Sequence, residues 1–252
     1  MDLLSIQNLT VTVNETKILD DVSFRVGKGR VTALAGPSGS GKTTAGMSIL
    51  RLLDQALRVR SGQVLFENED LLAMPAQDMR RVRGAQIAMV FQEPLDAFDP
   101  LFTIGEQIDE VLAAHTDLSS QQRRQRAMEV LSRVQLPQPE RVIRRYPHQL
   151  SGGQRQRAMI AQSIACGPKL LIADEPTSNL DVVAQAGIMD VLRALKSEMS
   201  VILITHDLGM VAHIADDAVV LCEGMAVETG PVKDIMTNPC HPYTQAMVEV
   251  FR

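Results

Sequence analysis

The stretch Gly36-Pro-Ser-Gly-Ser-Gly-Lys-Thr43 decides the fold of this chain. It fits the pattern GxxxxGK[ST]. A short apolar run at residues 31–35 precedes it, and a helix is expected to begin at Lys42. A strand, a glycine-rich turn and a helix form the context in which such a loop binds phosphate. Glycines let backbone N–H groups turn inward around an anion, and the helix N-terminus adds partial positive charge. The stretch therefore predicts a phosphate-binding loop rather than an ordinary glycine turn.

Two residues of this loop have specific expected partners. Lys42 would reach the β- and γ-phosphates, and the Thr43 hydroxyl would bind Mg²⁺. The residues expected to bind the nucleotide here are Gly36, Ser38, Gly39, Ser40, Gly41, Lys42, Thr43 and Thr44.

A second motif places two carboxylates at the end of an apolar strand. Residues 170–173 are all apolar, and Asp174 and Glu175 follow directly. Adjacent acids at a buried strand end need a reason, because unpaired buried charge is costly. Asp174 suits the Mg²⁺ shell, and Glu175 suits a base that polarises the attacking water. The alternative, a strand-end turn with solvated acids, is weakened by the phosphate-binding loop upstream.

Gln92 and His206 end two further expected strands, at residues 87–91 and 201–205. Gln92 can contact Mg²⁺ or its water, although a surface amide is the plain alternative. A lone histidine is more often structural than catalytic. The position of His206 at a strand end favours catalysis, because parallel sheets bind ligands at the carboxyl ends of their strands.

The stretch Leu150-Ser-Gly-Gly-Gln154 reads LSGGQ. Alone it would be a glycine-containing turn before a helix. A hydroxyl, backbone donors and a helix N-terminus also suit an anion.

These motifs, in this order over about residues 3–230, resemble the ATP-binding cassette (ABC) family. The resemblance implies that ATP and Mg²⁺ are the cofactors and that Glu175, His206 and Gln92 are catalytic. It implies a Mg²⁺ set of Thr43, Gln92 and Asp174. It further implies that LSGGQ completes the nucleotide site of a partner subunit, and that residues 178–181 pass along the dimer interface, where Asn179 replaces the usual Ala. The nucleotide-binding residues added in this way are Ser151, Gly152, Gly153, Gln154 and Asp181.

One piece of the family pattern is missing. The family usually has an aromatic residue that stacks on adenine upstream of the phosphate-binding loop. The corresponding position falls near Val13, and no Tyr, Trp or Phe occurs before Phe24. We therefore expect weaker nucleotide binding than in a member with Tyr there.

Three further segments resemble one branch of the family, the importers of oligopeptides, dipeptides and nickel: residues 91–100, 181–186 and 238–244. This resemblance implies an ATPase subunit that powers uptake of nickel, a metal chelate or small peptides, with a dipeptide or oligopeptide importer as the alternative. It implies two transmembrane permease subunits, a second ATPase subunit (identical or different) and, indirectly, an extracytoplasmic solute-binding protein. The subunit would lie peripherally on the cytoplasmic face of the inner membrane. The short end at Arg252, without the cysteine cluster of many peptide members, favours the nickel and metallophore type.

Other classes fit the sequence less well. A soluble cassette protein of translation or DNA repair usually has two cassettes or a long coiled-coil insertion. A phosphate-loop kinase would not need LSGGQ. An inactive interaction subunit would not need Lys42, Asp174, Glu175 and His206 together.

Composition sets outer limits. The chain has 252 residues, of which 45% are hydrophobic, enough for a large core. Its net charge of −5 argues against a nucleic-acid partner. No apolar run approaches the roughly 20 residues that a membrane span needs. The N-terminus lacks a secretion signal. Three scattered cysteines suit a reducing compartment as idle thiols; Cys240 and His241 alone make no metal site.

The fold expected is α/β: a phosphate-loop NTPase core with a mostly parallel sheet, an N-terminal antiparallel β subdomain and an inserted α-helical subdomain. One domain would span residues 1–252. A helical subdomain at 93–158 would interrupt the nucleotide-binding core at 1–92 and 159–235, and 236–252 would be a short tail. In detail, we expect a turn at Ser61-Gly62, helices at 104–114 and 121–134, and a hairpin turn at Glu223-Gly224. We also expect Arg123, Arg124 and Arg126 to be solvated.

Overall fold

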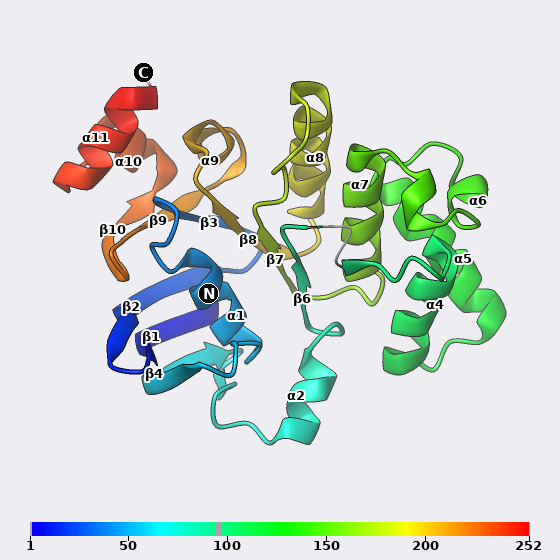
Figure 1. Cartoon of the computed structure of the whole chain (residues 1–252), viewed down its shortest axis with the longest axis horizontal. Coiled ribbons are helices and arrows are strands. Elements are labelled where there is room, and N and C mark those ends of the chain that lie inside the picture. Colours follow the sequence, from blue (N-terminus) through cyan, green and yellow to red (C-terminus); the bar gives the residue numbers. More distant parts are fainter. Residues whose placement is uncertain (1, 94–96, 252) are drawn as a thin grey trace. The chain divides into compact units, whose positions relative to one another are not determined.

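The computed structural model describes residues 2–93 and 97–251. The chain divides into two compact units. The first joins Met1–Arg80 to Glu198–Arg252, and the second is Arg81–Ser197 (Figure 1). The expected helical insert at residues 93–158 lies within the second unit, apart from its undescribed residues 94–96.

The first unit begins with an antiparallel sheet in the order β2-β1-β4-β5. Buried and exposed residues alternate from Val22 to Val26 of β2, as the apolar and polar alternation of the sequence predicts. Ile6 of β1, for example, lies opposite Phe24 of β2 and Val64 of β4, and all three side chains are buried. This sheet confirms the antiparallel β subdomain. Its strands are β1 (Asp2–Val13), β2 (Thr16–Gly27), β4 (Leu57–Phe66) and β5 (Glu69–Asp70).

The prediction of a turn at Ser61-Gly62 is wrong. Strand β4 continues through both residues, and its pairing with β1 shifts register between Gln7 and Thr10. Gly62 has φ 103°, and a Cβ there would lie 2.6 Å from the Cα of Leu9. The glycine therefore marks a bulge where two strands approach closely, a role that is hard to distinguish from a turn by sequence.

The phosphate-binding loop follows a parallel part of the same unit. β3 (Val31–Ala35), buried at every residue, pairs in parallel with β8 (Ser200–Thr205) and β9 (Asp217–Cys222). β9 and β10 (Met225–Pro231) form an antiparallel hairpin. Glu223 and Gly224 both have positive φ at its tip, which confirms the expected hairpin turn. Helices α1 (Lys42–Ile49) and α9 (Leu208–Ile214) belong to this unit, and α1 begins at the expected residue.

The residues expected as a short tail are mostly helical. α10 (Val232–Thr237) and α11 (Pro242–Phe251) end the described chain (Figure 1, red). Val248 of α11 is 1% exposed and belongs to one core cluster with Val220 and Val232. The C-terminal segment is therefore part of the core of the first unit.

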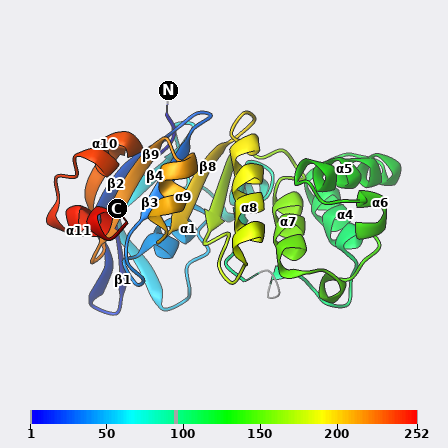
Figure 2. The ribbon, with the colours of Figure 1, turned by 90° about the horizontal axis from the view of Figure 1, so that it is seen from above.

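The second unit contains a parallel pair of strands, β6 (Ile87–Val90) and β7 (Leu170–Asp174), whose residues are all buried. Helices make up most of the remainder, and α7 and α8 run side by side in it (Figure 2). The helices expected at 104–114 and 121–134 are confirmed, to within one residue at each end. Helix α2 (Ala76–Val82) crosses the boundary between the units. The other helical elements are α4 (Ile104–His115), α5 (Ser120–Arg133), α6 (Pro139–Val142), the 3₁₀ turn η1 (Pro147–Gln149), α7 (Gly152–Ser163) and α8 (Val182–Leu195).

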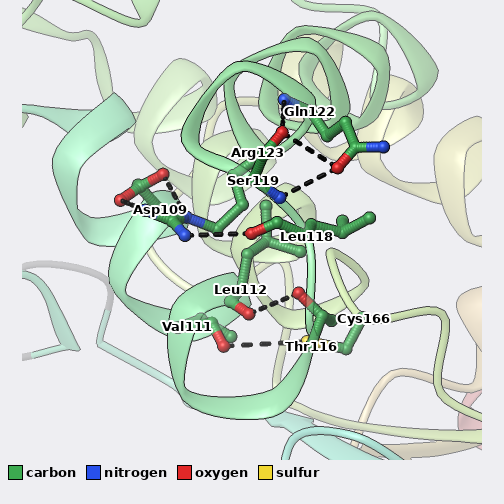
Figure 3. A network of polar contacts seen from close by, with 9 residues as sticks. All are labelled: Asp109, Val111, Leu112, Thr116, Leu118, Ser119, Gln122, Arg123 and Cys166. Atoms are coloured by element: carbon green, nitrogen blue, oxygen red, sulfur yellow. Dashed lines mark hydrogen bonds and ion pairs between the residues drawn. The ribbon is translucent and has the colours of Figure 1, made fainter.

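Two of the three arginines expected to be solvated are bound within this unit. The Arg123 guanidinium donates to both carboxylate oxygens of Asp109, at 2.7 and 3.1 Å, and to the carbonyl of Leu118 at 3.1 Å (Figure 3). Arg126 donates to the carbonyl of Ala165 at 2.9 Å. Arg124 is exposed, as predicted. Long basic side chains on a helix can reach neighbouring elements, so helical position alone does not predict solvation.

Candidate functional site

Two glycines of the phosphate-binding loop are required by their surroundings. Gly36 has φ 149°, and a Cβ there would lie 2.1 Å from the carbonyl oxygen of Leu221 in β9. Gly41 has φ 96°, and a Cβ would lie 2.6 Å from a methyl carbon of Leu19 in β2. Both the backbone conformation and the space exclude a side chain. Strands β9 and β2 therefore constrain the backbone of the loop at Gly36 and Gly41.

Lys42 and Ser40 are polar residues of this loop that the fold buries. Lys42 is 6% exposed, and its Nζ donates to the carbonyls of Gly36 at 2.9 Å and Pro37 at 2.8 Å. Ser40 is 2% exposed, and its Oγ has no hydrogen-bond partner among the residues that the structure describes. Buried polar groups are normally satisfied, so an orphaned hydroxyl in the same loop as a buried ammonium suits a ligand. Oxyanions such as nucleotide phosphates fit both groups.

His206 leaves the same sheet edge as the phosphate-binding loop. Ala35 of β3 pairs with Thr205 of β8, so Gly36 and His206 follow paired residues of neighbouring parallel strands. Asp207 then caps α9, because its Oδ1 accepts from the backbone N–H groups of Gly209 at 2.7 Å and Met210 at 3.3 Å. The capped turn places His206 at an exposed position after a buried strand.

The second unit repeats this arrangement for Gln92 and the acidic pair. Val90 of β6 pairs in parallel with Ala173 of β7. Gln92, two residues after β6, and Asp174, the last residue of β7, therefore lie at the ends of neighbouring strands, as predicted. Asp174 is 3% exposed, whereas Gln92 is exposed.

Glu175 has φ 44°, a left-handed conformation that is uncommon for a residue with a long side chain. The backbone N–H of Ser178 donates to its carbonyl at 3.1 Å. Such strained residues persist where surrounding contacts hold them, and they cluster at functional sites.

The LSGGQ segment begins α7 with a reciprocal cap. The Ser151 hydroxyl accepts from the backbone N–H of Gln154 at 3.3 Å, and the Gln154 side chain accepts from the Ser151 N–H at 3.2 Å. A Cβ on Gly152 would lie 3.3 Å from Leu180, and one on Gly153 would lie 3.1 Å from Ala184. The segment therefore has a structural task, capping α7 close to α8, which sequence reasoning missed. A serine followed three residues later by Gln was the available signal.

Asp181 likewise has a structural task. Its Oδ1 accepts from the backbone N–H of Ala184 at 2.9 Å and so caps α8. This contact does not test the expected role of Asp181 in nucleotide binding, which stays a prediction.

The residues expected to hold Mg²⁺ are hard oxygen donors. Thr43 lies in the first unit, and Gln92 and Asp174 lie in the second. Within residues 2–93 and 97–251, no cluster of three or more His, Cys, Asp or Glu side chains could hold a metal by itself. The hydroxyl, amide and carboxylate oxygens of Thr43, Gln92 and Asp174 suit Mg²⁺, which is bound by few protein oxygens together with water and substrate phosphates. Over the same residues, no helix is long and apolar enough to cross a membrane.

A curled glycine loop with a buried lysine, and a carboxylate pair at the end of a parallel strand, define a nucleotide-hydrolysing protein of the phosphate-loop class. The sequence profile of the ABC transporter family matches residues 19–178. The chain belongs to the ABC transporter family, and it is an ATPase of that family.

Individual proteins agree with this assignment. A Brucella abortus ATP-binding protein named for peptide import is 47% identical, over 98% of this chain and 76% of its own length. The dipeptide transport ATP-binding protein DppD of Haemophilus influenzae is 45% identical, over 98% and 77%. The ATP-binding cassette MJ0796, in a dimeric post-hydrolysis structure with ADP and Pi, is 28% identical with a TM-score of 0.80, covering 91% of this chain and 98% of that chain. The structural match confirms the expected α/β cassette fold. Neither of the two sequence relatives is named for nickel.

A contact between two side chains of the second unit was not predicted from the sequence. Glu93 follows Gln92, and Asn179 follows Ser178; the amide of Asn179 donates to the Glu93 carboxylate at 2.9 Å. The replacement of the usual Ala by Asn179 was the only sequence signal, and nothing in the sequence pointed to Glu93 as its partner.

Proposed function

We propose that this chain is the ATP-hydrolysing subunit of a peptide importer. Nucleotide binding is supported by the buried ammonium of Lys42 and the orphaned hydroxyl of Ser40, which belong to one loop that requires glycine at positions 36 and 41. Import of peptides is supported by the names of the relatives from Brucella abortus and Haemophilus influenzae, which refer to peptide import and dipeptide transport.

The phosphate-binding loop would hold the nucleotide. Lys42 would donate to the β- and γ-phosphates, and Ser40 would donate its free hydroxyl to a phosphate oxygen. The backbone N–H groups at the start of α1 would add their partial positive charge. The remaining loop residues in this role are Gly36, Ser38, Gly39, Gly41, Thr43 and Thr44.

Hydrolysis would use Mg²⁺ together with the remaining residues predicted to be catalytic. Thr43, Gln92 and Asp174 would hold Mg²⁺, which when bound neutralises charge on the phosphate oxygens. Glu175 would accept a proton from the attacking water. His206, exposed at its strand end, would donate a hydrogen bond to the γ-phosphate or its water.

A second ATPase subunit, identical or different, would complete the site. Ser151, Gly152, Gly153 and Gln154 would face the γ-phosphate bound by that partner, with Asp181 nearby in sequence on the interface loop. The backbone N–H groups at the N-terminus of α7, which helices leave without intrahelical partners, suit an anion. Support for pairing of this kind is the dimeric structure of the cassette MJ0796.

The other partners would be two transmembrane permeases and, indirectly, an extracytoplasmic solute-binding protein. The chain would then act on the cytoplasmic face of the inner membrane as a peripheral subunit. The sequence analysis favoured nickel because the chain ends at Arg252. The names of the two relatives favour peptides as the solute instead.

The solute is tested by uptake in cells that contain the cognate permeases. Cells with the intact subunit should accumulate a labelled dipeptide or oligopeptide, and cells with Glu175→Gln should not. Glu140→Gln, an exposed acid of the same unit, is the matched control and should behave as the intact chain does. Uptake of radioactive nickel with no peptide uptake would contradict the peptide proposal and restore the nickel one.

A further inference from the structure

Two loops of the second unit are joined by hydrogen bonds that the nucleotide chemistry does not require. One loop carries Gln92 and Glu93 after β6, and the other carries Ser178 and Asn179 after β7. The Asn179 amide donates to the Glu93 carboxylate at 2.9 Å. The Ser178 hydroxyl lies 3.3 Å from the carbonyl of Gln92 and 3.0 Å from the carbonyl of Glu175, so it can share its proton between them. We call Glu93 and Asn179 the loop latch.

The backbone of the second loop depends on such contacts. Glu175 and Asn179 have φ 44° and 61°, so two left-handed residues lie within five positions. Asn tolerates this conformation far better than most residues with side chains, and Ala does not share that tolerance. Asn179 therefore does two things that the usual Ala could not do: it fits the turn without strain and it donates a hydrogen bond to the neighbouring loop.

We propose that the loop latch positions Glu175 relative to Gln92. The turn after β7, which carries Glu175, would then move together with the loop after β6, which leads into the helical residues 93–158. Ser178 connects the two ends of this path, because its hydroxyl contacts the carbonyls of both Gln92 and Glu175. Glu93 and Asn179 are positioning residues and do not contact substrate in this proposal. The inference rests on the roles proposed above for Gln92 and Glu175.

The expected effect is on turnover rather than on binding. Both latch side chains are exposed in the single chain, so their hydrogen bond is screened by water and only moderately strong there. Loss of the bond should lower kcat for ATP hydrolysis about three- to tenfold, because a misplaced base costs transition-state stabilisation. The KM for ATP should change less than about twofold, since the phosphate-binding loop lies outside the latch.

Four variants of the full-length chain separate the latch from backbone conformation and from charge. Asn179→Gly removes the side chain but keeps left-handed freedom. Asn179→Asp places two carboxylates opposite each other, and its kcat should be at least as low as that of Asn179→Gly. Glu93→Gln keeps an oxygen that can accept, and should stay near wild type. The double variant Asn179→Asp with Glu93→Gln restores the hydrogen bond with donor and acceptor exchanged, and should recover most of the lost kcat.

The measurements are kcat and KM for ATP, and backbone hydrogen–deuterium exchange over residues 91–93 and 175–181. Faster exchange in both segments of Asn179→Gly, with recovery of exchange and kcat in the double variant, is the expected result. Wild-type kcat in Asn179→Gly, a double variant no faster than Asn179→Asp alone, or exchange that changes in one segment only would each overturn the latch. Glu175→Gln is measured in parallel: normal turnover there would remove the base role, whereas the exchange data would still report whether the two loops are joined.

Discussion

At the scale of single residues, the chemistry depends on a few side chains whose surroundings leave them little freedom. Lys42 is buried and bonded to the two carbonyls at the start of its own loop. A group held in this way loses little conformational entropy when it binds, because it is already ordered. Lys42 is therefore the residue whose removal should harm nucleotide affinity most directly.

Lys42→Ala should weaken ATP binding about 10- to 100-fold, because hydrogen bonds to charged groups contribute about 1.5–3 kcal/mol. Titration with a fluorescent ATP analogue measures the effect. Lys28→Ala is the matched control, since Lys28 is half-exposed and paired with Glu67 at 3.4 Å in the same unit. Equal affinity in Lys42→Ala and the intact chain would show that the loop does not bind phosphate through this lysine.

Val13 is the second residue-scale test. It ends β1 as a half-buried residue paired with Thr16, and an aromatic residue is usual near this position in the family. Stacking on a base contributes about 1–3 kcal/mol, so Val13→Tyr should raise ATP affinity about 5-fold or more. Val13→Leu, which adds size without a flat ring, should not. Unchanged ATP affinity in the Tyr variant would mean that adenine is held elsewhere.

At the scale of elements, the orientation of α7 depends on one arginine. The Arg157 side chain donates to the carbonyls of Val134 at 3.0 Å and Gln135 at 3.1 Å, at the end of α5. A Cβ on Gly187, in the middle of α8, would lie 2.1 Å from the guanidinium. A glycine within a helix costs up to about 1 kcal/mol relative to Ala, so its presence indicates a need for space.

Gly187→Ala should therefore destabilise the chain by about 1–2 kcal/mol, because displacing the Arg157 guanidinium outweighs the gain in helix propensity. In an Arg157→Ala background, the same change should be neutral or stabilising by up to about 1 kcal/mol. Urea denaturation of the four proteins measures this cycle. Additive effects of the two substitutions would show that Arg157 and Gly187 are independent.

The second element-scale prediction concerns the C-terminal segment and pH. Burial tends to raise the pKa of Glu228 in β10, but the backbone N–H groups of Cys240 and His241, which donate at 2.9 and 3.0 Å, outweigh it and hold the pKa below its usual range. A lowered folded-state pKa stabilises the fold above the unfolded value, about 4.3, and this contribution is lost as pH falls through the folded-state pKa.

Glu228→Gln should therefore lower Tm by about 2–4 °C at pH 7, and the difference should shrink below about pH 4. The effect is modest because Glu228 is partly exposed and its charge is screened. Thermal denaturation of both proteins between pH 3 and 7 is the measurement, with the exposed Glu223→Gln as control. A constant difference across this range would mean that the ionised carboxylate does not hold residues 240–241.

Sequence patterns predicted the strands and helices around the site well, because local periodicity and glycine chemistry determine them. They predicted which motifs follow neighbouring strands, as the pairing of Val90 with Ala173 and of Ala35 with Thr205 shows. They missed contacts between segments far apart in the chain: the bulge at Gly62, the binding of Arg123 by Asp109, and the latch between Glu93 and Asn179. Such contacts depend on tertiary placement, which no local pattern encodes.

At the scale of the whole molecule, the chain consists of two units that each bring two motifs to the end of a parallel strand pair. The phosphate-binding loop and His206 belong to one unit, and Gln92 and the acidic pair belong to the other. In our proposal Lys42 of the first unit binds the nucleotide and Glu175 of the second acts as the base, so nucleotide binding and turnover should be separable by substitution. Substitutions in the second unit should slow turnover while nucleotide affinity persists.

The most direct test of this separation is Glu175→Gln in the purified full-length chain, with ATP binding, ATP turnover and molecular mass in solution measured together. The variant should bind ATP with the affinity of the intact chain, lose nearly all turnover, and accumulate as an ATP-dependent dimer seen by light scattering. Glu140→Gln should retain normal turnover. ATP hydrolysis by Glu175→Gln at the rate of the intact chain would contradict the assignment of Glu175 as the base, and with it the proposed mechanism.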